Sequence, residues 1–269
     1  MNFWQKGKVA IANALALDLT HAEVQYGRIL ERNVTDGVSW LEMGCGRHLV
    51  PYHSMPRETQ GAMAGRARLL VGVDVDQAIR EHPLLHARVF GLGERLPFAS
   101  RTFDLVSADM VVEHLEAPLA VLREIRRVLK PAGRFVFHTP NYHNYLTFLA
   151  SLTPDWLKDP IVLFLDNRES QDRFRTYYRL NTATTVRRLA TAAGLEVEEL
   201  HIVGSSGSLG KLWFIGWLEC FVLKAQAAMF GGRFRDNLIG VLRRPPEDGS
   251  AEQAAAQGRP VSGEGKGAC

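Results

Sequence analysis

Residues 38–48 constrain the fold of this chain more than any other segment. They read Val-Ser-Trp-Leu-Glu-Met-Gly-Cys-Gly-Arg-His, a short apolar run that ends in an acidic residue and a Gly-x-Gly turn. The run is typical of a buried strand, and glycines at its end let the backbone pass close to a ligand because no Cβ is present. In an open α/β sheet such a turn follows the first strand, beside the ligand site. Gly-x-Gly also occurs in plain tight turns, so the assignment needs support from downstream segments.

A second apolar strand provides part of that support. Residues 69–73 are apolar or glycine and end at Asp74. In nucleotide-binding α/β folds an acid at this place accepts hydrogen bonds from both ribose hydroxyls. A third short strand is expected over residues 86–90, and it leads into a turn that contains Gly93 and Glu94.

The following segments alternate between strand and helix patterns. Residues 100–109 contain the expected fourth strand, which ends at Asp109 and Met110. A helix with apolar residues at helical spacing is expected from about Pro118 to a terminator at residues 130–133. Further strands are expected over residues 134–141, 196–203 and 237–242, the last two forming an antiparallel end of the sheet. This alternation predicts an α/β fold with a doubly wound, mostly parallel sheet.

Six ordered segments together resemble one family. They are Leu41-Glu42-Met43-Gly44-Cys45-Gly46, Val73-Asp74, Leu96-Pro97-Phe98, Phe103-Asp104, Glu113-His114 and Arg127-Val128-Leu129-Lys130-Pro131-Ala132-Gly133. In these segments the chain resembles the class I S-adenosylmethionine-dependent methyltransferases, of the type 11 group that includes quinone-biosynthesis methyltransferases. The resemblance covers most of residues 20–203. It implies a Rossmann-like, doubly wound sheet of seven strands with an antiparallel last strand, and S-adenosyl-L-methionine as the cofactor.

The resemblance also implies a cofactor site at the strand ends. Its expected members are Glu42, Gly44, Cys45 and Gly46 at the amino-acid end of the cofactor, Asp74 at the ribose, Gly93 and Glu94 at the adenine, and Asp109 and Met110 at the sulfonium. Asp109 has an alternative interpretation as a strand-end cap. Two positions depart from the family pattern: His48 replaces a third glycine, and Leu92 replaces an acid on the adenine side.

Two histidines are candidates for catalysis. A methyl group on a sulfonium is already activated, so the protein mainly supplies placement and a dry pocket. An oxygen acceptor must lose its proton, and a carbon acceptor must react as an enolate or phenolate, so a base near neutral pKa helps. His114 follows the fourth strand and His138 ends the fifth. His114 has an alternative role in a structural hydrogen bond. No sequence pattern indicates a metal.

Two segments are expected to be additions to a single domain over residues 1–244. Residues 141–181 are rich in aromatic residues and arginines and are interpreted as an inserted helical cap, acting either as a lid over the acceptor or as a cap that packs its own aromatics. Residues 204–236 form an apolar helical insertion. Residues 245–269 have no aromatic residue and predict a disordered tail.

The apolar core of the second insertion, residues 212–230, leaves three interpretations open. A membrane span needs about twenty predominantly apolar residues, and Glu219, Lys224 and Gly216 argue against one here. The segment is then a buried helix, a homodimer face, or an interfacial helix that gives peripheral membrane contact near a lipid-linked acceptor.

Composition narrows the class of partner. The formal net charge is +3 and the basic residues are scattered, so no nucleic-acid partner is expected. The three cysteines lack metal spacing, and no secretory signal is recognised, so a cytoplasmic location is expected, with association at the membrane periphery as a variant.

Taken together, these patterns predict a methyltransferase that acts on a small or lipid-linked organic acceptor by O- or C-methylation. One alternative is a Rossmann module that binds a nucleotide or S-adenosylmethionine without catalysis. The other is an NAD-dependent oxidoreductase, but its Gly-x-Gly-x-x-Gly fingerprint would require glycine where Leu49 stands.

Overall fold

A seven-stranded sheet forms the centre of the computed structural model, which describes residues 21–91, 93–143, 174–204 and 235–246. The strand order is β3-β2-β1-β4-β5-β7-β6. The strands are β1 (Ser39–Met43), β2 (Leu69–Asp74), β3 (Ala87–Phe90), β4 (Phe103–Asp109), β5 (Leu129–Pro140), β6 (Glu196–Val203) and β7 (Asn237–Arg243). All neighbours pair in parallel except β7, which runs antiparallel to both β5 and β6. The predicted fold class is confirmed.

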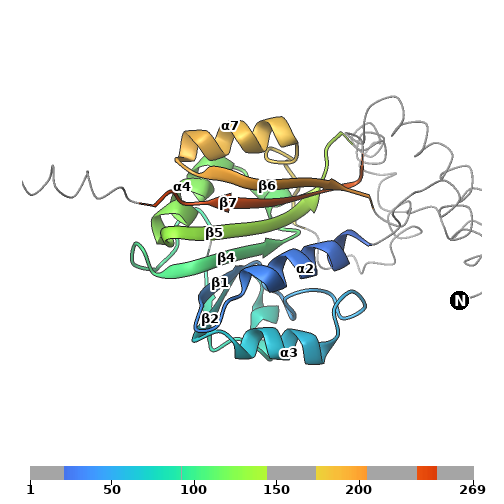
Figure 1. Cartoon of the computed structure of the whole chain (residues 1–269), viewed down its shortest axis with the longest axis vertical. Helices are drawn as coiled ribbons and strands as arrows, with labels where there is room; N and C mark the ends of the chain where they lie inside the picture. The colour runs from blue at the N-terminus through green and yellow to red at the C-terminus, as the bar shows by residue number, and fades with distance from the viewer. Residues whose placement is uncertain (1–20, 92, 144–173, 205–234, 247–269) are drawn as a thin grey trace, which may run out of the picture.

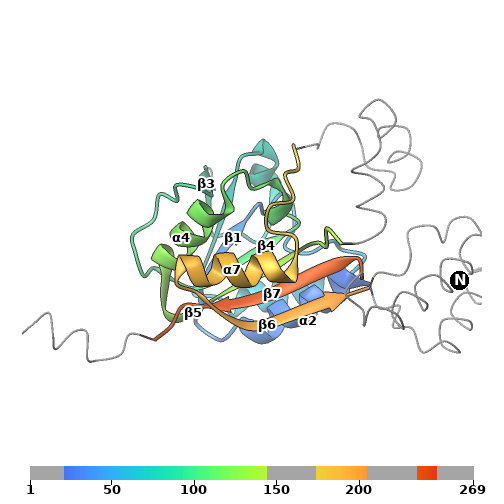
Figure 2. The same ribbon diagram turned by 90° about the horizontal axis from the view of Figure 1, so that it is seen from above.

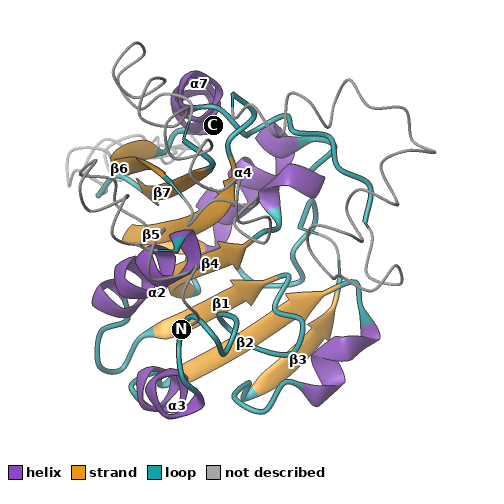
Figure 3. Ribbon diagram, turned by 90° about the vertical axis from the view of Figure 1, so that its right-hand side faces the viewer, coloured by secondary structure: helices purple, strands orange, loops and turns teal. Residues whose placement is uncertain are grey.

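Helices cover both faces of this sheet (Figures 1 and 3). They are α2 (Ala22–Asn33), α3 (Arg57–Gly65), α4 (Pro118–Val128) and α7 (Ala183–Ala193), with short 3₁₀ helices η1 (Gln77–Glu81) and η2 (Val112–His114). Helices α4 and α7 lie beside each other on one face (Figure 2), and their apolar residues share one core with the sheet. Helices α2 and α3 cover the opposite face and bury a second core. Both faces of β1 are therefore covered, which explains why all five of its residues are buried.

The order of the strands creates a switch point beside β1. Strand β1 pairs with β2 on one side and with β4 on the other, so the chain winds outward in one direction through β3 and then in the other through β5. In open α/β sheets, ligands bind outside the carboxyl ends of the strands at such a point.

One predicted boundary differs from the structure. The segment at residues 130–133 was expected to separate helix α4 from the next strand, but β5 already begins at Leu129. Leu129 pairs with Phe103 of β4, and Ala132 and Gly133 exchange backbone hydrogen bonds with Arg244 beyond β7. Pairing on both sides keeps this stretch within the sheet.

Several predicted segments lie outside the described residues. These are most of the cap at residues 141–181, nearly all of the insertion at residues 204–236 including its apolar core 212–230, and the tail at residues 245–269 except its first two residues. Within the described ranges, no helix combines the length and apolar character that a membrane crossing requires.

The centre of β7 packs closely against β5, and a substitution there can test this packing. Gly240 lies opposite Phe137 of β5, and an ideal Cβ built on Gly240 would lie 2.4 Å from Phe137 Cε1. Phe137 is fully buried and stacks on Phe135, so its ring has little room to move. We expect Gly240→Ala to lower the free energy of unfolding by about 1–3 kcal/mol, measured by urea denaturation.

Gly61 in helix α3 is the matched control. An ideal Cβ on Gly61 meets no heavy atom within 4 Å. Because alanine is the better helix former, Gly61→Ala should raise the free energy of unfolding by about 0.5–1 kcal/mol. Equal effects of the two substitutions would contradict this description of the packing.

Candidate active site

A cavity of about 580 Å³ opens at the carboxyl edge of the sheet. Its walls come from the loops after β1, β2, β3 and β4 and from residues 174–177. Ligand sites usually enclose 300–1,000 Å³. The cavity therefore has the size and position that the switch point predicts for a ligand site.

The glycine loop after β1 forms one wall. Gly44 and Gly46 line the cavity and have φ angles of +64° and +45°, which residues with a Cβ rarely adopt. A Cβ on Gly44 would lie 2.3 Å from Val111 Cγ2. The Gly44 N–H donates to the Val73 carbonyl at 2.8 Å and holds the loop against β2. At these two glycines the loop therefore exposes backbone atoms, without side chains, to the cavity.

Asp74 joins this loop to the one after β2. Its Oδ2 accepts from the Gly46 N–H at 2.8 Å, and its Oδ1 accepts from the Asp76 N–H at 2.9 Å. The side chain also lines the cavity, although the residue is only 8% exposed. An ionised carboxylate has about four acceptor sites. Asp74 can therefore hold both loops and still accept hydrogen bonds from a ligand.

The structure brings together some of the other predicted cofactor residues. Gly93 and Met110 line the cavity. Met110 has a φ of +55°, an unusual value for a methionine that costs on the order of 1 kcal/mol. Its N–H donates to the His138 carbonyl at 2.9 Å, which fixes this turn after β4.

Cys45 and Glu94 do not line the cavity. Cys45 is buried behind the glycine loop, with its Sγ 4.0 Å from the Val73 carbonyl oxygen. Burial raises the pKa of its thiol, so the neutral form persists. Glu94 is exposed.

Glu42 is the third predicted residue outside the cavity walls. It is 1% exposed and accepts a hydrogen bond from Ser107, which in turn accepts one from the Trp40 indole. Burial, reinforced by the charge of Asp109, raises the pKa of Glu42 to about 8. Glu42 thus belongs to a polar network beneath the glycine loop.

Asp109 is the fourth predicted cofactor residue outside the cavity walls, and it forms a separate polar pair with His138. His138 Nδ1 lies 2.7 Å from Asp109 Oδ1, and His138 Nε2 lies 3.2 Å from Asn237 Oδ1. The His138 ring also stacks on Tyr26 of α2 at 5.6 Å and is 2% exposed. Burial alone would lower the pKa of His138, but the hydrogen bond and charge of Asp109 outweigh it and raise the pKa. Both ring nitrogens are occupied, and the ring lies behind the cavity wall.

His114, the other histidine candidate, does line the cavity. Its Nδ1 lies 3.0 Å from the Arg175 carbonyl oxygen, which can only accept a hydrogen bond. Nδ1 of a neutral His114 ring therefore bears the proton, and Nε2 has a free lone pair. His114 Nε2 lies 3.9 Å from Glu113 Oε1.

Residues 174–177 cover this end of the cavity. Phe174 meets the His114 ring edge-on at 6.0 Å, and the Arg175 guanidinium lies 5.0 Å from the Tyr177 ring centre. The Tyr177 N–H donates to the Glu113 carbonyl at 2.8 Å, which anchors the segment. Aromatic and cationic groups thus lie beside an imidazole.

Sequence reasoning missed several wall residues. Val75, Asp76 and Ala78 follow Asp74, and Val111 and Leu115 flank the predicted residues after β4. These residues could have been found because they directly follow the predicted motifs, and residues just after a strand end lie at the same edge of the sheet.

A Gly-x-Gly loop after the first strand, an acid at the end of the second and a cavity between them are together typical of a nucleotide-binding α/β domain.

Comparison with known proteins identifies the family. A family model described as a methyltransferase domain matches residues 19–200. The chain therefore belongs to this methyltransferase family. The prediction of a class I S-adenosylmethionine-dependent methyltransferase, with S-adenosylmethionine as the family's cofactor, is confirmed at this level.

Curated relatives agree with that family. The chain is 35% identical over 126 residues to a probable S-adenosylmethionine-dependent methyltransferase of Mycolicibacterium smegmatis, covering 44% of each protein. It is 32% identical over 132 residues to a ubiquinone biosynthesis O-methyltransferase of Cereibacter sphaeroides, covering 45% of this chain and 49% of the relative. The chain thus spans about half the length of these relatives.

Solved structures agree in fold. A putative methyltransferase in complex with the Trm112 activator from Haloferax volcanii aligns with a TM-score of 0.52 at 17% identity, over 89% of this chain and 94% of that one. A methyltransferase from Methanosarcina mazei aligns with a TM-score of 0.51 at 14% identity, over 81% and 98% of the two chains. At these identities the likeness concerns the fold alone.

The raised pKa of Glu42 predicts how stability changes with pH. Between pH 4.5 and 8 the unfolded chain loses the Glu42 proton while the folded chain keeps it. The folded state then binds more protons, so this residue's contribution to the free energy of unfolding falls as pH rises, by up to about 1.4 kcal/mol per pH unit. Glu42→Gln removes this dependence, so its stability relative to wild type should rise with pH across the window. Urea denaturation at several pH values measures the difference, and parallel pH profiles would contradict it.

Proposed function

We propose that this chain transfers a methyl group from S-adenosylmethionine to a small or lipid-linked organic acceptor, with a phenolic hydroxyl as the favoured group. One observation carries the proposal: a single cavity joins the Gly44–Gly46 loop and Asp74 to His114 and residues 174–177. A site for a nucleotide cofactor and a site for a deprotonated aromatic acceptor would then meet in one enclosure. C-methylation of the same ring is the alternative outcome.

The residues present fit the cofactor. Gly44 and Gly46 line the cavity without side chains, which leaves more room for a ligand. Asp74 has acceptor sites left for ribose hydroxyls. Gly93 lines the cavity on the side expected for adenine, and Met110 lines it beside the strand end expected for the sulfonium. When bound, S-adenosylmethionine supplies the activated methyl group. The protein supplies orientation and excludes water.

His114 is the proposed base. Because its Nδ1 proton is directed to the Arg175 carbonyl, Nε2 is the atom that takes the acceptor's proton. Glu113 Oε1 lies 3.9 Å from Nε2, and burial raises the pKa of this carboxyl. In its charged form Glu113 would favour the imidazolium that forms. The carbonyl of Arg175 fixes the ring orientation throughout.

Phe174, Arg175 and Tyr177 are the proposed acceptor contacts. Aromatic rings pack on a planar acceptor, and a guanidinium stabilises a phenolate or an acidic substituent. The ubiquinone biosynthesis O-methyltransferases among the relatives support an acceptor of this kind.

His138 is proposed as a positioning residue. Its side chain is hydrogen-bonded to Asp109 through Nδ1, and its backbone carbonyl accepts a hydrogen bond from the Met110 N–H. The pair therefore sets the turn after β4 that lines the cavity. Glu42 would support the glycine loop in the same indirect way.

Asp74 provides the first test. We expect calorimetric titration to show S-adenosylmethionine binding to the wild type and no binding of NAD. Asp74→Ala should weaken S-adenosylmethionine binding roughly ten- to hundredfold, because hydrogen bonds to a charged acceptor are lost. Asp36→Ala, in the exposed turn before β1, is the matched control and should bind as wild type does.

Either of two results would overturn the cofactor assignment. One is NAD binding that Asp74→Ala abolishes. The other is a folded wild type that binds no S-adenosylmethionine.

His114 provides the test of catalysis. With a catechol acceptor, formation of S-adenosylhomocysteine by His114→Gln should have a kcat roughly 10²–10⁴-fold below wild type, while S-adenosylmethionine affinity is unchanged. His201→Ala is the control, because His201 lies on β6 and pairs with Glu199 at 2.7 Å. Full activity of His114→Gln would remove His114 from the mechanism. Cofactor binding with no turnover on any hydroxylated or carbon acceptor would favour the non-catalytic module.

A further inference from the structure

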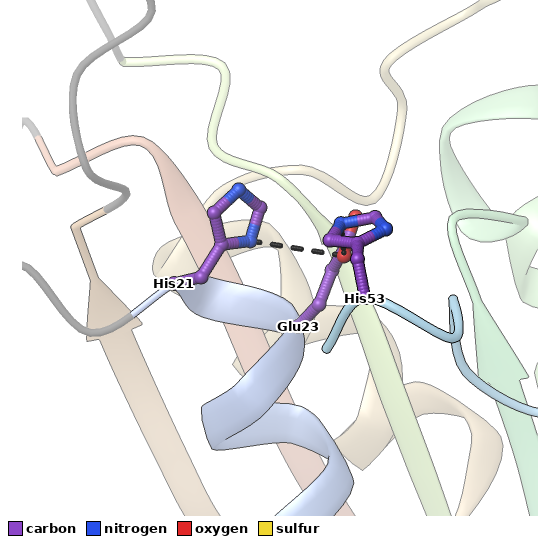
Figure 4. Close-up of side chains that lie close together, drawn as sticks. All are labelled: His21, Glu23 and His53. Carbon is purple, nitrogen blue, oxygen red and sulfur yellow. Dashed lines mark ion pairs between the residues drawn. The ribbon is translucent and has the colours of Figure 1, made fainter. Parts of the chain in front are cut away.

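Three side chains converge at the start of helix α2 (Figure 4). His21 precedes the helix, Glu23 lies in its first turn, and His53 comes from the loop that follows the glycine loop. One nitrogen from each histidine and one Glu23 oxygen all lie within 4.8 Å of one another. We propose that these residues form a binding site for a divalent transition metal of the zinc type, a site that the sequence pattern did not predict.

The distances suit such an ion after small side-chain movements. Glu23 Oε2 lies 2.9 Å from His53 Nε2 and 3.7 Å from His21 Nδ1. Zinc binds nitrogen and oxygen at about 2.0–2.2 Å, so neighbouring ligand atoms of a tetrahedral site lie about 3.3–3.5 Å apart. The two distances to Glu23 Oε2 fall on either side of that range. The histidine rings are nearly perpendicular, with centres 5.9 Å apart, so they approach the carboxylate from different directions.

His21 Nδ1 gives the second indication. The His21 side chain is 42% exposed, but its Nδ1 atom is shielded from solvent and has no hydrogen-bond partner in the described part of the chain. A buried polar atom without a partner is costly and rare. A metal ion shared with Glu23 and His53 would satisfy it.

Glu23 has the surroundings of a metal ligand. Its side chain is 14% exposed, and the Ser54 hydroxyl donates to Glu23 Oε2 at 2.6 Å. Hydrogen bonds of this kind orient the carboxylates that bind metals. His53 is 69% exposed, so an ion can enter from solvent.

The donor set selects the type of ion. Two imidazole nitrogens and one carboxylate oxygen favour zinc, cobalt or nickel over calcium or magnesium, which prefer oxygen ligands. Three protein ligands leave one tetrahedral position for water. The ion would tie helix α2 to the loop at residues 51–55, separately from the cofactor cavity, whose walls contain none of the three residues.

Metal titration of the full chain without an affinity tag tests the site. We expect zinc to bind with one-to-one stoichiometry in calorimetry, and cobalt to give the intense visible absorption of a tetrahedral complex. His53→Ala and Glu23→Gln should each weaken zinc binding at least about tenfold, because even residues that only support metal ligands contribute that much. His201→Ala is the matched histidine control and should bind as wild type does.

Circular dichroism checks that the variants are folded. We expect both to fold, because His53 is exposed and Glu23→Gln conserves the shape of the side chain. Three results would overturn the proposal. They are a wild type that binds no zinc, zinc binding that survives both substitutions, and a cobalt spectrum of the octahedral aqueous kind. In those cases the cluster is an ion pair between Glu23 and His53, reinforced by Ser54.

Discussion

The hydrogen bonds to the Asp74 carboxylate are the interactions on which the proposed cofactor site depends. This carboxylate accepts the Gly46 N–H with one oxygen and the Asp76 N–H with the other, so the loops after β1 and β2 are held by one side chain. Gly44 bonds to the Val73 carbonyl on the same strand. With both loops tied to β2, the backbone at Gly44 and Gly46 is set before any ligand arrives, and little ordering is needed on binding.

Much of the fold and the centre of the site could be predicted from sequence because their signals are local. Gly44, Gly46 and Asp74 act through backbone geometry at strand ends, and all three line the cavity. Side-chain direction could not be predicted as well. Glu94 lies one residue after Gly93, yet it faces solvent while Gly93 lines the cavity. The cluster at His21, Glu23 and His53 is formed by a loop meeting a helix, and no periodic pattern reports such a contact.

The two candidate histidines show why residue type alone does not define a role. His114 follows β4 in a short helix, where Nδ1 meets a carbonyl and the ring faces the cavity. His138 belongs to β5 itself, and its ring is enclosed by Tyr26, Asp109 and Asn237. One environment leaves a nitrogen lone pair for a reaction, and the other uses both nitrogens to stabilise the interior.

The position of β7 has a consequence for synthesis. Among the strands of the described residues, β7 comes last in sequence but lies between β5 and β6. Until residues 237–243 leave the ribosome, β5 has an open edge and β6 has no partner in the sheet. Open edges favour association between chains. The Asn237 contact with His138 is also missing until then. A nascent chain can therefore form the half of the sheet at the proposed cofactor site early, while the other half closes only when β7 is added.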